Sequence, residues 1–193
     1  VTPLRSVELC RRLARVRFRS VAVGPGELLA GAGPGAGADL LTLALVVQAA
    51  EMAGAMERSL EMTAAWASER YSFGRPLASY QALKHRFADM RTWLEAGLAI
   101  VERAARAVDA GDGGAPELAG AAKAYVADRG VELVQDCVQI HGGIGVTDDH
   151  DLHLFLRRVA AGYGLLGTPA EHRRRLGEAV AGRRRATAGG TEA

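Results

Sequence analysis

The stretch "SYQALKHRFADMRTWLEAGLAIV", from Ser79 to Val101, decides the fold class of this chain. Its apolar residues recur at steps of three and four, which is the spacing of one face of an α-helix. The members of this stripe are Leu83, Phe87, Met90, Leu94, Leu98 and Val101. Ser79 precedes the stripe and is a candidate N-cap, since its hydroxyl can accept a hydrogen bond from an unpaired N–H of the first turn. The stretch therefore predicts a long helix that packs one whole face against other elements.

Four more segments of the chain have a helical pattern, and all of them follow residue 38. We expect them at about 39–71 with Asp39 as the N-cap, at 116–141, at 149–161 and from Thr168 onward. The last opens with "TPAE", in which Thr168 caps, Pro169 takes the first helical position and Glu171 completes a capping box. Long helices joined by short loops predict a mainly α fold, an up-and-down four-helix-type bundle preceded by a short β remnant.

The first thirty residues have a different pattern. In "ARVRFRSVAV", residues 14–23, arginines alternate with Val16 and Phe18, which is typical of a half-buried β-strand. The "GPG" that follows ends this strand, and "GAGPGAGA" at 31–38 is a flexible connector. We therefore expect a β-strand remnant of a middle domain (1–30), a linker (31–38), a helical bundle (39–181) and a flexible tail (182–193).

The composition is that of an ordinary soluble domain. Of 193 residues, 49% are hydrophobic and 24% are charged, and the net charge of +2 favours no particular partner. No basic groove with interleaved aromatic residues is visible, so we expect no nucleic acid. We expect no membrane span, because no apolar run reaches the roughly 18 to 20 residues that a bilayer requires. The first residues lack the apolar core of a signal peptide, and Cys10 and Cys137 are too few for a disulfide framework, so the expected location is cytoplasmic.

The stretch "VQIHGGIGVTDDHDLH", residues 138–153, allows three interpretations. It is not a typical phosphate loop, because a helix precedes its glycines where a strand is needed. His150 and His153 could share a metal ion with the nearby aspartates, but the pattern H-E-x-x-H is absent and we predict no metal. The residues alone favour a helix end, with Gly142 in the left-handed conformation that commonly stops a helix.

Four short motifs, in their order and spacing, resemble the C-terminal helical domain of the acyl-CoA dehydrogenase family. The family pattern is R-x-x-F-G-x-P, a Gln that follows it, Q-x-x-G-G-x-G, and an Arg before a final E-G-T. The matching residues are Arg70, Phe73, Gly74, Pro76, Gln81, Gln139, Gly142, Gly143, Gly145, Arg157, Gly167 and Thr168. The resemblance covers about residues 38–180, and residues 1–30 resemble the last strands of the family's middle β-domain.

This resemblance implies that the chain helps to hold FAD across a subunit interface. The implied cofactor-binding residues are Arg70, Ser72, Phe73, Gln81, Gln139, Gly142, Gly143 and Thr168. Residues 70–73 would contact the pyrophosphate of a flavin seated mainly on the other subunit, and residues 139–143 would line its adenosine end. A guanidinium suits a phosphate, at roughly 1.5 to 3 kcal/mol per charged hydrogen bond, and glycines let the backbone approach. Without the resemblance, Arg70 is a cation at a helix C-terminus, where the helix dipole favours it.

The chain departs from the family where the catalytic base is expected. Members of the family use a carboxylate to remove the proton next to the thioester carbonyl, often the Glu of E-G-T, and Leu166 stands at that position here. The alternative base position on the first long helix falls at Ala44, and Leu45 stands where many members have an Arg near CoA. We therefore identify no catalytic residue. Glu51, two turns further along, is either a displaced base or a structural carboxylate.

The resemblance also implies a partner. The family's N-terminal domain and most of its β-domain are missing, so we expect a fragment of a longer protein or a half-length member. "TDDHDLH", residues 147–153, resembles T-W-E-H-D-L-H in the base-less partner subunits of heterotetrameric acyl-CoA dehydrogenases acting on steroid side chains. We expect a contribution to an FAD site for α,β-dehydrogenation of an acyl-CoA thioester, as a fragment or as a non-catalytic subunit of a homo- or hetero-oligomer. The alternatives are an enzyme with Glu51 as a relocated base, and a helical oligomerisation module that has lost flavin.

Overall fold

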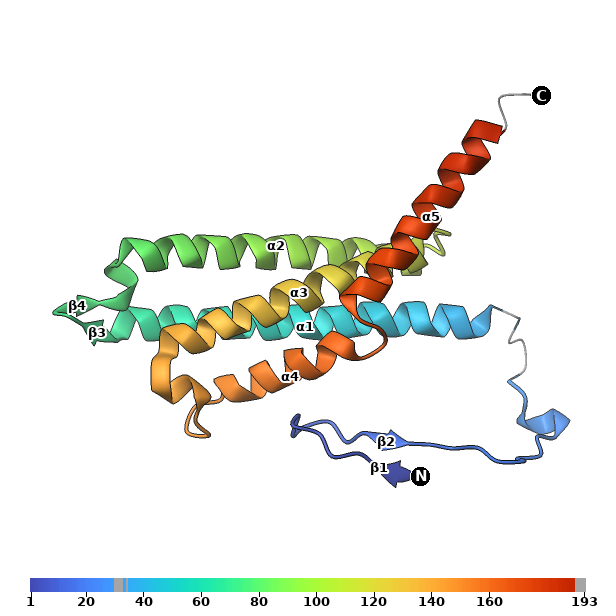
Figure 1. Ribbon diagram of the computed structural model, residues 1–193, viewed down its shortest axis with the longest axis horizontal. Coiled ribbons are helices and arrows are strands. Elements are labelled where there is room, and N and C mark those ends of the chain that lie inside the picture. The colour runs from blue at the N-terminus through green and yellow to red at the C-terminus, as the bar shows by residue number, and fades with distance from the viewer. Residues whose placement is uncertain (30–32, 34, 190–193) are drawn as a thin grey trace.

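The protein is mainly α-helical, as the sequence predicts. The computed structural model describes residues 1–29, 33 and 35–189. The helices in this part of the chain are α1 (Ala36–Glu69), α2 (Gln81–Asp109), α3 (Ala115–His141), α4 (Leu152–Gly164) and α5 (Pro169–Gly189). Helices α1 to α4 run up and down along the long axis of the molecule, and α5 packs against α3 and projects beyond the others (Figure 1). The predicted up-and-down bundle is confirmed.

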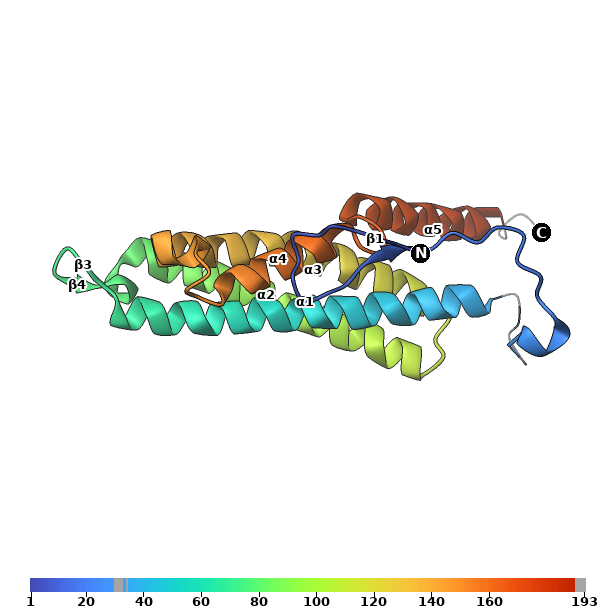
Figure 2. The same ribbon diagram turned by 90° about the horizontal axis from the view of Figure 1, so that it is seen from below.

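Short elements precede and connect the helices. Two antiparallel hairpins pair β1 (Thr2–Pro3) with β2 (Ala14–Arg15) and β3 (Tyr71–Ser72) with β4 (Arg75–Pro76). Thr2 lies opposite Arg15 in the first hairpin, and Tyr71 lies opposite Pro76 in the second. Short 3-10 helices are present at η1 (Pro25–Glu27), η2 (Leu77–Ser79) and η3 (Gly142–Val146). The β3–β4 hairpin projects from the end of the bundle that lies farthest from α5 (Figure 2).

Helix α3 is the centre of the core. It contacts each of the other four helices, and its buried face consists largely of alanine, glycine and valine. The large buried apolar side chains around this face are Met52 and Met56 of α1, Met90 and Leu94 of α2, Val126, Leu133 and Val134 of α3, and Leu152 and Val159 of α4. Burying each such side chain contributes about 1.5 to 3 kcal/mol to stability.

Two glycines let their helices come close to α1. A Cβ added at Gly130 of α3 would lie 3.5 Å from the side chain of Met56. A Cβ added at Gly162 of α4 would lie 2.8 Å from Sδ of Met52. A Cβ at Gly130 would make an ordinary van der Waals contact, whereas one at Gly162 would require Met52 to shift, which costs stability in a close-packed core. Gly162 thus sets how near α4 lies to α1, and Gly130 allows α3 to pack closely beside α1.

Helix α1 has the length and composition of a helix that could cross a membrane. Among the described residues it is the one such helix. An 18-residue window within it has a mean hydropathy of 1.4. This differs from the expectation that no segment is apolar enough to span a bilayer. Half of the window is buried inside the bundle, where α1 packs against α2, α3 and α4. The apolar composition therefore also serves the protein core.

The N-terminal segment differs from its prediction. In the described part of the chain, Ala14 and Arg15 are the residues of the expected strand that pair with another strand. Val16 and Phe18 are 54% and 79% exposed. A half-buried strand needs neighbouring strands to cover one face, and here the neighbour is the two-residue β1. The prediction that this strand is half-buried is wrong for this chain.

Three helix boundaries also differ from those expected. Helix α1 begins at Ala36 with Gly35 as its N-cap, so Asp39 lies in the first turn, because the alanines of the connector favour helix. The residue before α2 is Tyr80, and Ser79 belongs to η2. Helix α5 continues to Gly189, through most of the predicted flexible tail. Residues 30–32, 34 and 190–193, which belong to the predicted remnant, linker and tail, lie outside the described residues.

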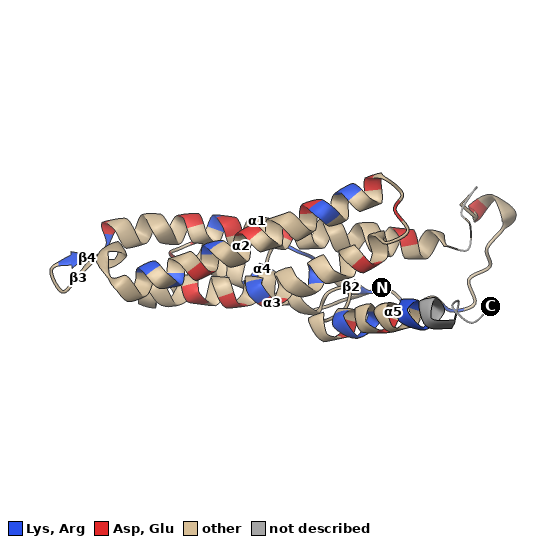
Figure 3. Ribbon diagram, turned by 90° about the horizontal axis from the view of Figure 1, so that it is seen from above, with Lys and Arg blue, Asp and Glu red and all other residues tan. Residues whose placement is uncertain are grey.

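The start of α5 has the predicted capping box. The carboxylate of Glu171 accepts hydrogen bonds from the main-chain N–H and the hydroxyl of Thr168, at 2.6 and 2.8 Å. In return, the N–H of Glu171 donates to Oγ1 of Thr168 at 3.3 Å. Basic side chains then follow one another along α5 (Figure 3). The local sequence alone was enough to locate this helix start.

Burial shifts the pKa of three basic side chains in the bundle. They are Lys123 and His141 of α3 and His172 of α5. Loss of water is the largest cause that lowers the pKa of each one, since burial disfavours the charged form. The two imidazoles are 5% and 3% exposed and are neutral at pH 7 in the folded protein.

We expect the free energy of unfolding to fall as the pH drops below about 6.5. The unfolded chain takes up protons at His141 and His172 near the ordinary histidine pKa of 6.5, whereas the folded chain takes them up at lower pH. Above pH 6.5, the two neutral imidazoles make their full contribution to the free energy of unfolding. This contribution is lost as the pH falls through the pKa values that the imidazoles have in the folded protein. Urea titrations between about pH 8 and about pH 5 measure this loss. A free energy that stays constant over the range would contradict the burial of neutral imidazoles.

The glycines after α3 provide a matched pair of substitutions. A Cβ at Gly145 would lie 2.9 Å from the main-chain oxygen of Val138, whereas one at Gly143 would meet nothing within 4 Å. Gly145→Ala should lower the free energy of unfolding by about 1 to 3 kcal/mol, and Gly143→Ala should change it by less than about 0.5 kcal/mol. Urea denaturation of both variants measures the difference. Equal stabilities would mean that η3 does not pack tightly on the end of α3.

Candidate functional site

Most of the candidate cofactor-binding residues lie together at one end of the bundle. Helix α1 ends there, the β3–β4 hairpin and the start of α2 follow, and α3 ends beside them (Figure 1). The residues of this group, which define the motif end, are Arg70, Ser72, Phe73, Gln81, Gln139, Gly142 and Gly143. The remaining candidate, Thr168, lies apart from them at the start of α5, beyond the other end of α4.

The β3–β4 hairpin is fixed at its base and presents its tip to solvent. The hydroxyl of Tyr80 donates to the carbonyl of Ser72 at 2.7 Å, and this bond ties the hairpin to the start of α2. Phe73 and Gly74 turn the chain with positive φ angles of 49° and 80°. The side chain of Phe73 is 97% exposed. A fully exposed aromatic ring held in a strained backbone conformation suits a contact with something outside this chain.

Arg70 caps α1 and carries an exposed cation. Its main-chain N–H donates to the carbonyl of Trp66 at 2.8 Å, and its guanidinium carbon lies 5.9 Å from the centre of the Trp66 ring. Within the described residues, no carboxylate lies within 4 Å of this guanidinium, so its donors are available to an external anion. Arg75 adds a second cation, with its guanidinium carbon 3.8 Å from the centre of the Tyr80 ring.

The glycine turn ends α3 as the sequence predicts. Gly142 has a φ of 70°, and its N–H donates to the carbonyls of Gln139 and Val138. Gly142 and Gly143 are exposed, and a Cβ at either would meet nothing within 4 Å. The side chain of Gln139 is exposed on the last turn of the helix. The main chain here is therefore open to close approach by a ligand.

A stack of rings joins the two halves of the motif end. The rings of Trp66 and His141 have their centroids 5.3 Å apart with planes inclined by 15°, and the His150 ring lies 4.6 Å from His141. Nδ1 of His141 lies 2.8 Å from the carbonyl of Cys137, so Nδ1 carries the proton of the neutral ring. Nε2 of His141 and Nε1 of Trp66 are buried and have no hydrogen-bond partner within the described part of the chain. Buried polar atoms normally have partners, so these two atoms favour a polar ligand at this end.

Sequence reasoning missed Trp66 and His141. Trp66 precedes Arg70 by one helical turn, and the stack depends on how α1 packs against α3, which no local pattern reveals. The position of His141 between Gln139 and Gly142 was the available signal.

Two buried bases hold the turn between α4 and α5. Nζ of Lys123 donates to the carbonyls of Tyr163 and Gly167 at 3.2 and 3.3 Å. Nε2 of His172 lies 3.1 Å from the carbonyl of Leu166, and Leu166 itself has a φ of 60°. The backbone is thus fixed at the position where the family pattern has its Glu. The side chain there is an alkyl group, which cannot accept a proton.

The other candidate positions for a base are also unsuitable. Ala44 and Leu45 of α1 are not ionisable. Glu51 forms ion pairs with Arg158 and, at 2.5 Å, with Arg11. Taking up a proton would break both pairs, so these contacts favour the structural interpretation of Glu51.

The ion pairs of Glu51 belong to a network that fastens the N-terminal segment to α1 and α4. Arg158 of α4 also pairs with the buried Glu8 at 3.2 Å. The carboxylate of Glu8 accepts two further hydrogen bonds, from the main-chain N–H groups of Cys10 and Arg11. Burial alone would raise the pKa of Glu8, but these main-chain donors, together with the guanidinium of Arg158, hold it below its usual value.

The histidines of residues 138–153 bond to the main chain. Nδ1 of His150 accepts from the N–H of Leu152 at 3.2 Å, and Nδ1 of His153 lies 3.1 Å from the carbonyl of Thr147. Among the described residues, no group of three or more His, Cys, Asp and Glu side chains could hold a metal ion.

Comparison with known proteins finds relatives along most of the chain. Residues 38–181 match the family described as "Acyl-CoA dehydrogenase, C-terminal domain". Acyl-CoA dehydrogenase IpdE2 of Mycobacterium tuberculosis is 34% identical over 177 residues, which cover 90% of this chain and 50% of that protein. The chain therefore spans about half the length of this relative.

Two solved structures share the fold. The Tcur3481-Tcur3483 steroid ACAD, a variant form, has a TM-score of 0.75 and 33% identity, over 79% of this chain and 42% of that one. The ChsE4-ChsE5 complex from Mycobacterium tuberculosis has a TM-score of 0.69 and 31% identity, over 77% of this chain and 40% of that one. With its helical bundle, its motif end and a family match over residues 38–181, this chain belongs to the acyl-CoA dehydrogenase family.

Proposed function

We propose that the motif end forms one wall of an FAD site at a subunit interface, for α,β-dehydrogenation of an acyl-CoA thioester. In this proposal the chain is a non-catalytic partner subunit or the C-terminal part of a longer protein. The observation that carries the proposal is the meeting of Arg70 and the glycine turn at one exposed end, where Trp66 stacks on His141.

The residues of the motif end fit a dinucleotide. A diphosphate binds best to cations and hydrogen-bond donors, and Arg70 and Ser72 offer a guanidinium and a hydroxyl there. The open main chain at Gly142 and Gly143 allows close approach. Nε1 of Trp66 can donate to a nucleotide, and Nε2 of His141 can accept from a nucleotide hydroxyl or amine. Because members of the family are FAD-dependent, FAD is the dinucleotide that membership favours.

Bound FAD would supply the acceptor for a hydride from the acyl chain. Arg70 would hold the diphosphate, and the exposed ring of Phe73 would cover apolar surface of the flavin or of the other subunit and exclude water. The hairpin projects away from its own bundle, which supports a site that another subunit or another part of a longer chain completes.

A base from a partner chain is part of the proposal, because Leu166, Ala44 and Glu51 do not provide one. Two solved structures similar to this chain have names that join two proteins, Tcur3481-Tcur3483 and ChsE4-ChsE5. This supports a hetero-oligomer in which a second subunit carries the carboxylate that removes the proton.

Replacing Arg70 with Ala should weaken FAD binding in the native assembly by about tenfold to a hundredfold, since it removes one or two charged hydrogen bonds. Arg91→Ala is the matched control, because Arg91 lies on α2 and pairs with Glu95 of the same helix. Quenching of FAD fluorescence measures the Kd, and gel filtration checks that both variants still assemble.

An unchanged Kd in the Arg70→Ala variant would contradict the assignment of the motif end. An assembly that does not bind FAD at all would instead favour the alternative function, a helical oligomerisation module without flavin.

Replacing Glu51 with Gln should leave the dehydrogenation rate of an active assembly within about twofold of the wild type, because the ion pairs of Glu51 with Arg11 and Arg158 are structural. A positioned base contributes roughly 10² to 10⁴-fold. A rate loss of that size, in a variant that still assembles and binds FAD, would make Glu51 the relocated base and overturn the partner-base proposal.

A further inference from the structure

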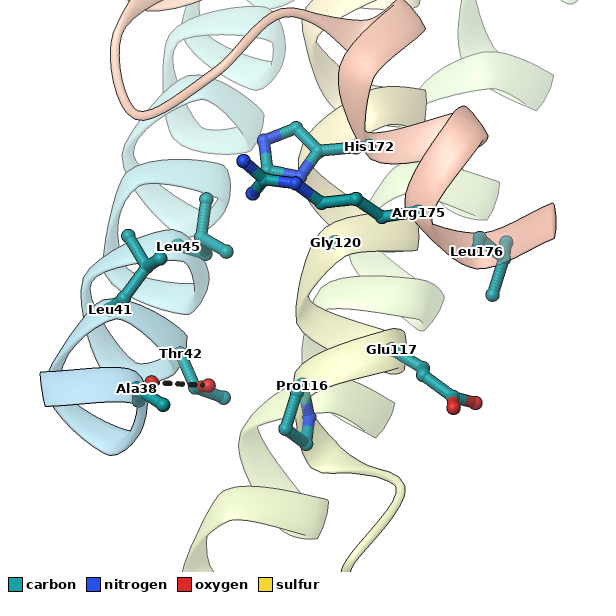
Figure 4. A pocket seen from close by; sticks show the side chains of 10 residues that line it. All are labelled: Ala38, Leu41, Thr42, Leu45, Pro116, Glu117, Gly120, His172, Arg175 and Leu176. Atoms are coloured by element: carbon teal, nitrogen blue, oxygen red, sulfur yellow. Dashed lines mark hydrogen bonds between the residues drawn. The ribbon is translucent and has the colours of Figure 1, made fainter. Parts of the chain in front are cut away.

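A cleft of about 210 Å³ opens between α1, α3 and α5, at the end of the bundle opposite to the motif end. The close view shows the first turns of α1 on one side, the start of α3 behind and α5 across the opening (Figure 4). The residues that matter for its chemistry are Leu41, Leu45, Gly120, His172, Arg175 and Leu176. The proposed flavin site uses none of them.

The walls of the cleft are apolar. Leu41 and Leu45 of α1 line one side of the cleft, and Leu176 of α5 lines the other (Figure 4). The hydroxyl of Thr42 also lies at the cleft, but it already donates to the carbonyl of Ala38 at 2.8 Å. A cavity of roughly 150 Å³ can hold a benzene ring, so this cleft has room for a body of roughly six to nine non-hydrogen atoms.

His172 places a buried hydrogen-bond acceptor at the inner wall. Its Nε2 lies 3.1 Å from the carbonyl of Leu166, which can only accept, so Nε2 carries the proton and Nδ1 has a free lone pair. The side chain is 3% exposed, and Nδ1 has no hydrogen-bond partner within the described part of the chain. A Cβ added at Gly120, on the cleft wall, would lie 3.5 Å from this Nδ1. A ligand in the cleft could therefore donate a hydrogen bond to it.

Arg175 places a cation at the mouth. Its side chain reaches from α5 across the opening toward α1 (Figure 4), and no carboxylate of the described residues lies within 4 Å of its guanidinium. The acidic residue of the lining, Glu117, is already paired with Arg183. The first turns of α1 and α3 both border the cleft, and helix N-termini favour negative charge. The mouth therefore favours an anion.

We propose that this cleft binds a small aliphatic hydroxy acid. The alkyl body lies between Leu41, Leu45 and Leu176. The hydroxyl donates to Nδ1 of His172, and the carboxylate pairs with the guanidinium of Arg175. This site is separate from the flavin site, and its occupation does not depend on FAD.

Isothermal titration calorimetry of the full chain, without flavin, tests the ligand class. The probes are 3-hydroxyhexanoate, hexanoate and 1-hexanol, which share one alkyl body. Hexanoate should bind about tenfold more tightly than hexanol because of Arg175, and 3-hydroxyhexanoate should bind roughly threefold to tenfold more tightly than hexanoate because of His172. Equal affinities for the three probes, or no binding of the acids, would overturn the proposal.

Two pairs of variants test the residues. Arg175→Ala should weaken binding of both acids about tenfold and leave hexanol unchanged. Arg174→Ala is its control, because Arg174 is exposed and pairs with Glu178. Gly120→Ala places a methyl group against Nδ1 of His172 and should abolish the advantage of the hydroxy acid. It should also keep or raise the melting temperature, since alanine favours helix. Its control is Gly54→Ala in α1, where a Cβ would meet nothing within 4 Å.

The proposal fails if the Arg175→Ala and Arg174→Ala variants bind the acids equally well. It also fails if hexanoyl-CoA binds the wild type at least tenfold more tightly than either acid and Gly120→Ala removes that binding, because the cleft would then belong to a thioester. These outcomes can be interpreted even if the chain does not bind FAD, because none of the binding experiments on the cleft uses FAD.

Discussion

The close approach of α1, α3 and α4 is the constraint on which the rest of the structure depends. Gly130 of α3 and Gly162 of α4 lie against the methionines of α1, with no room for a Cβ at Gly162, and alanines fill much of the face of α3. Because α1 and α3 run in the same direction, this contact brings both of their C-termini to the motif end (Figure 1). The same contact brings both of their N-termini to the border of the cleft.

The helix dipoles at the two ends are opposite, but an arginine at each end favours an anion. Helix C-termini carry partial negative charge, and the cation of Arg70 is both a cap for α1 and a ligand group for an anion from outside. At the other end, N-termini and the side chain of Arg175 add positive charge around an apolar cleft. Between them lies the turn of Leu166, held by Lys123 and His172 but without an acid. The proposal that a partner chain supplies the base accounts for the alkyl side chain at this turn.

Local patterns in the sequence predicted what is decided locally. The apolar stripe of α2, the capping box at Thr168 and the helix stop at Gly142 depend on residues a few positions apart, and all three are present. The strand at residues 14–23 was mispredicted because its burial depends on neighbouring strands. The stack of Trp66 on His141 and the acceptor of His172 join residues far apart in the sequence. They could not be predicted, because only the packing of α1, α3 and α5 brings them together.

The most direct test of the central claim is hydrogen–deuterium exchange of the native assembly, read by mass spectrometry, with and without FAD. If the motif end is a wall of the flavin site, FAD should slow exchange in residues 70–76 and 139–145 together, while the exposed face of α2 is unchanged. Protection confined to other segments, or protection of one of these two segments without the other, would contradict the account.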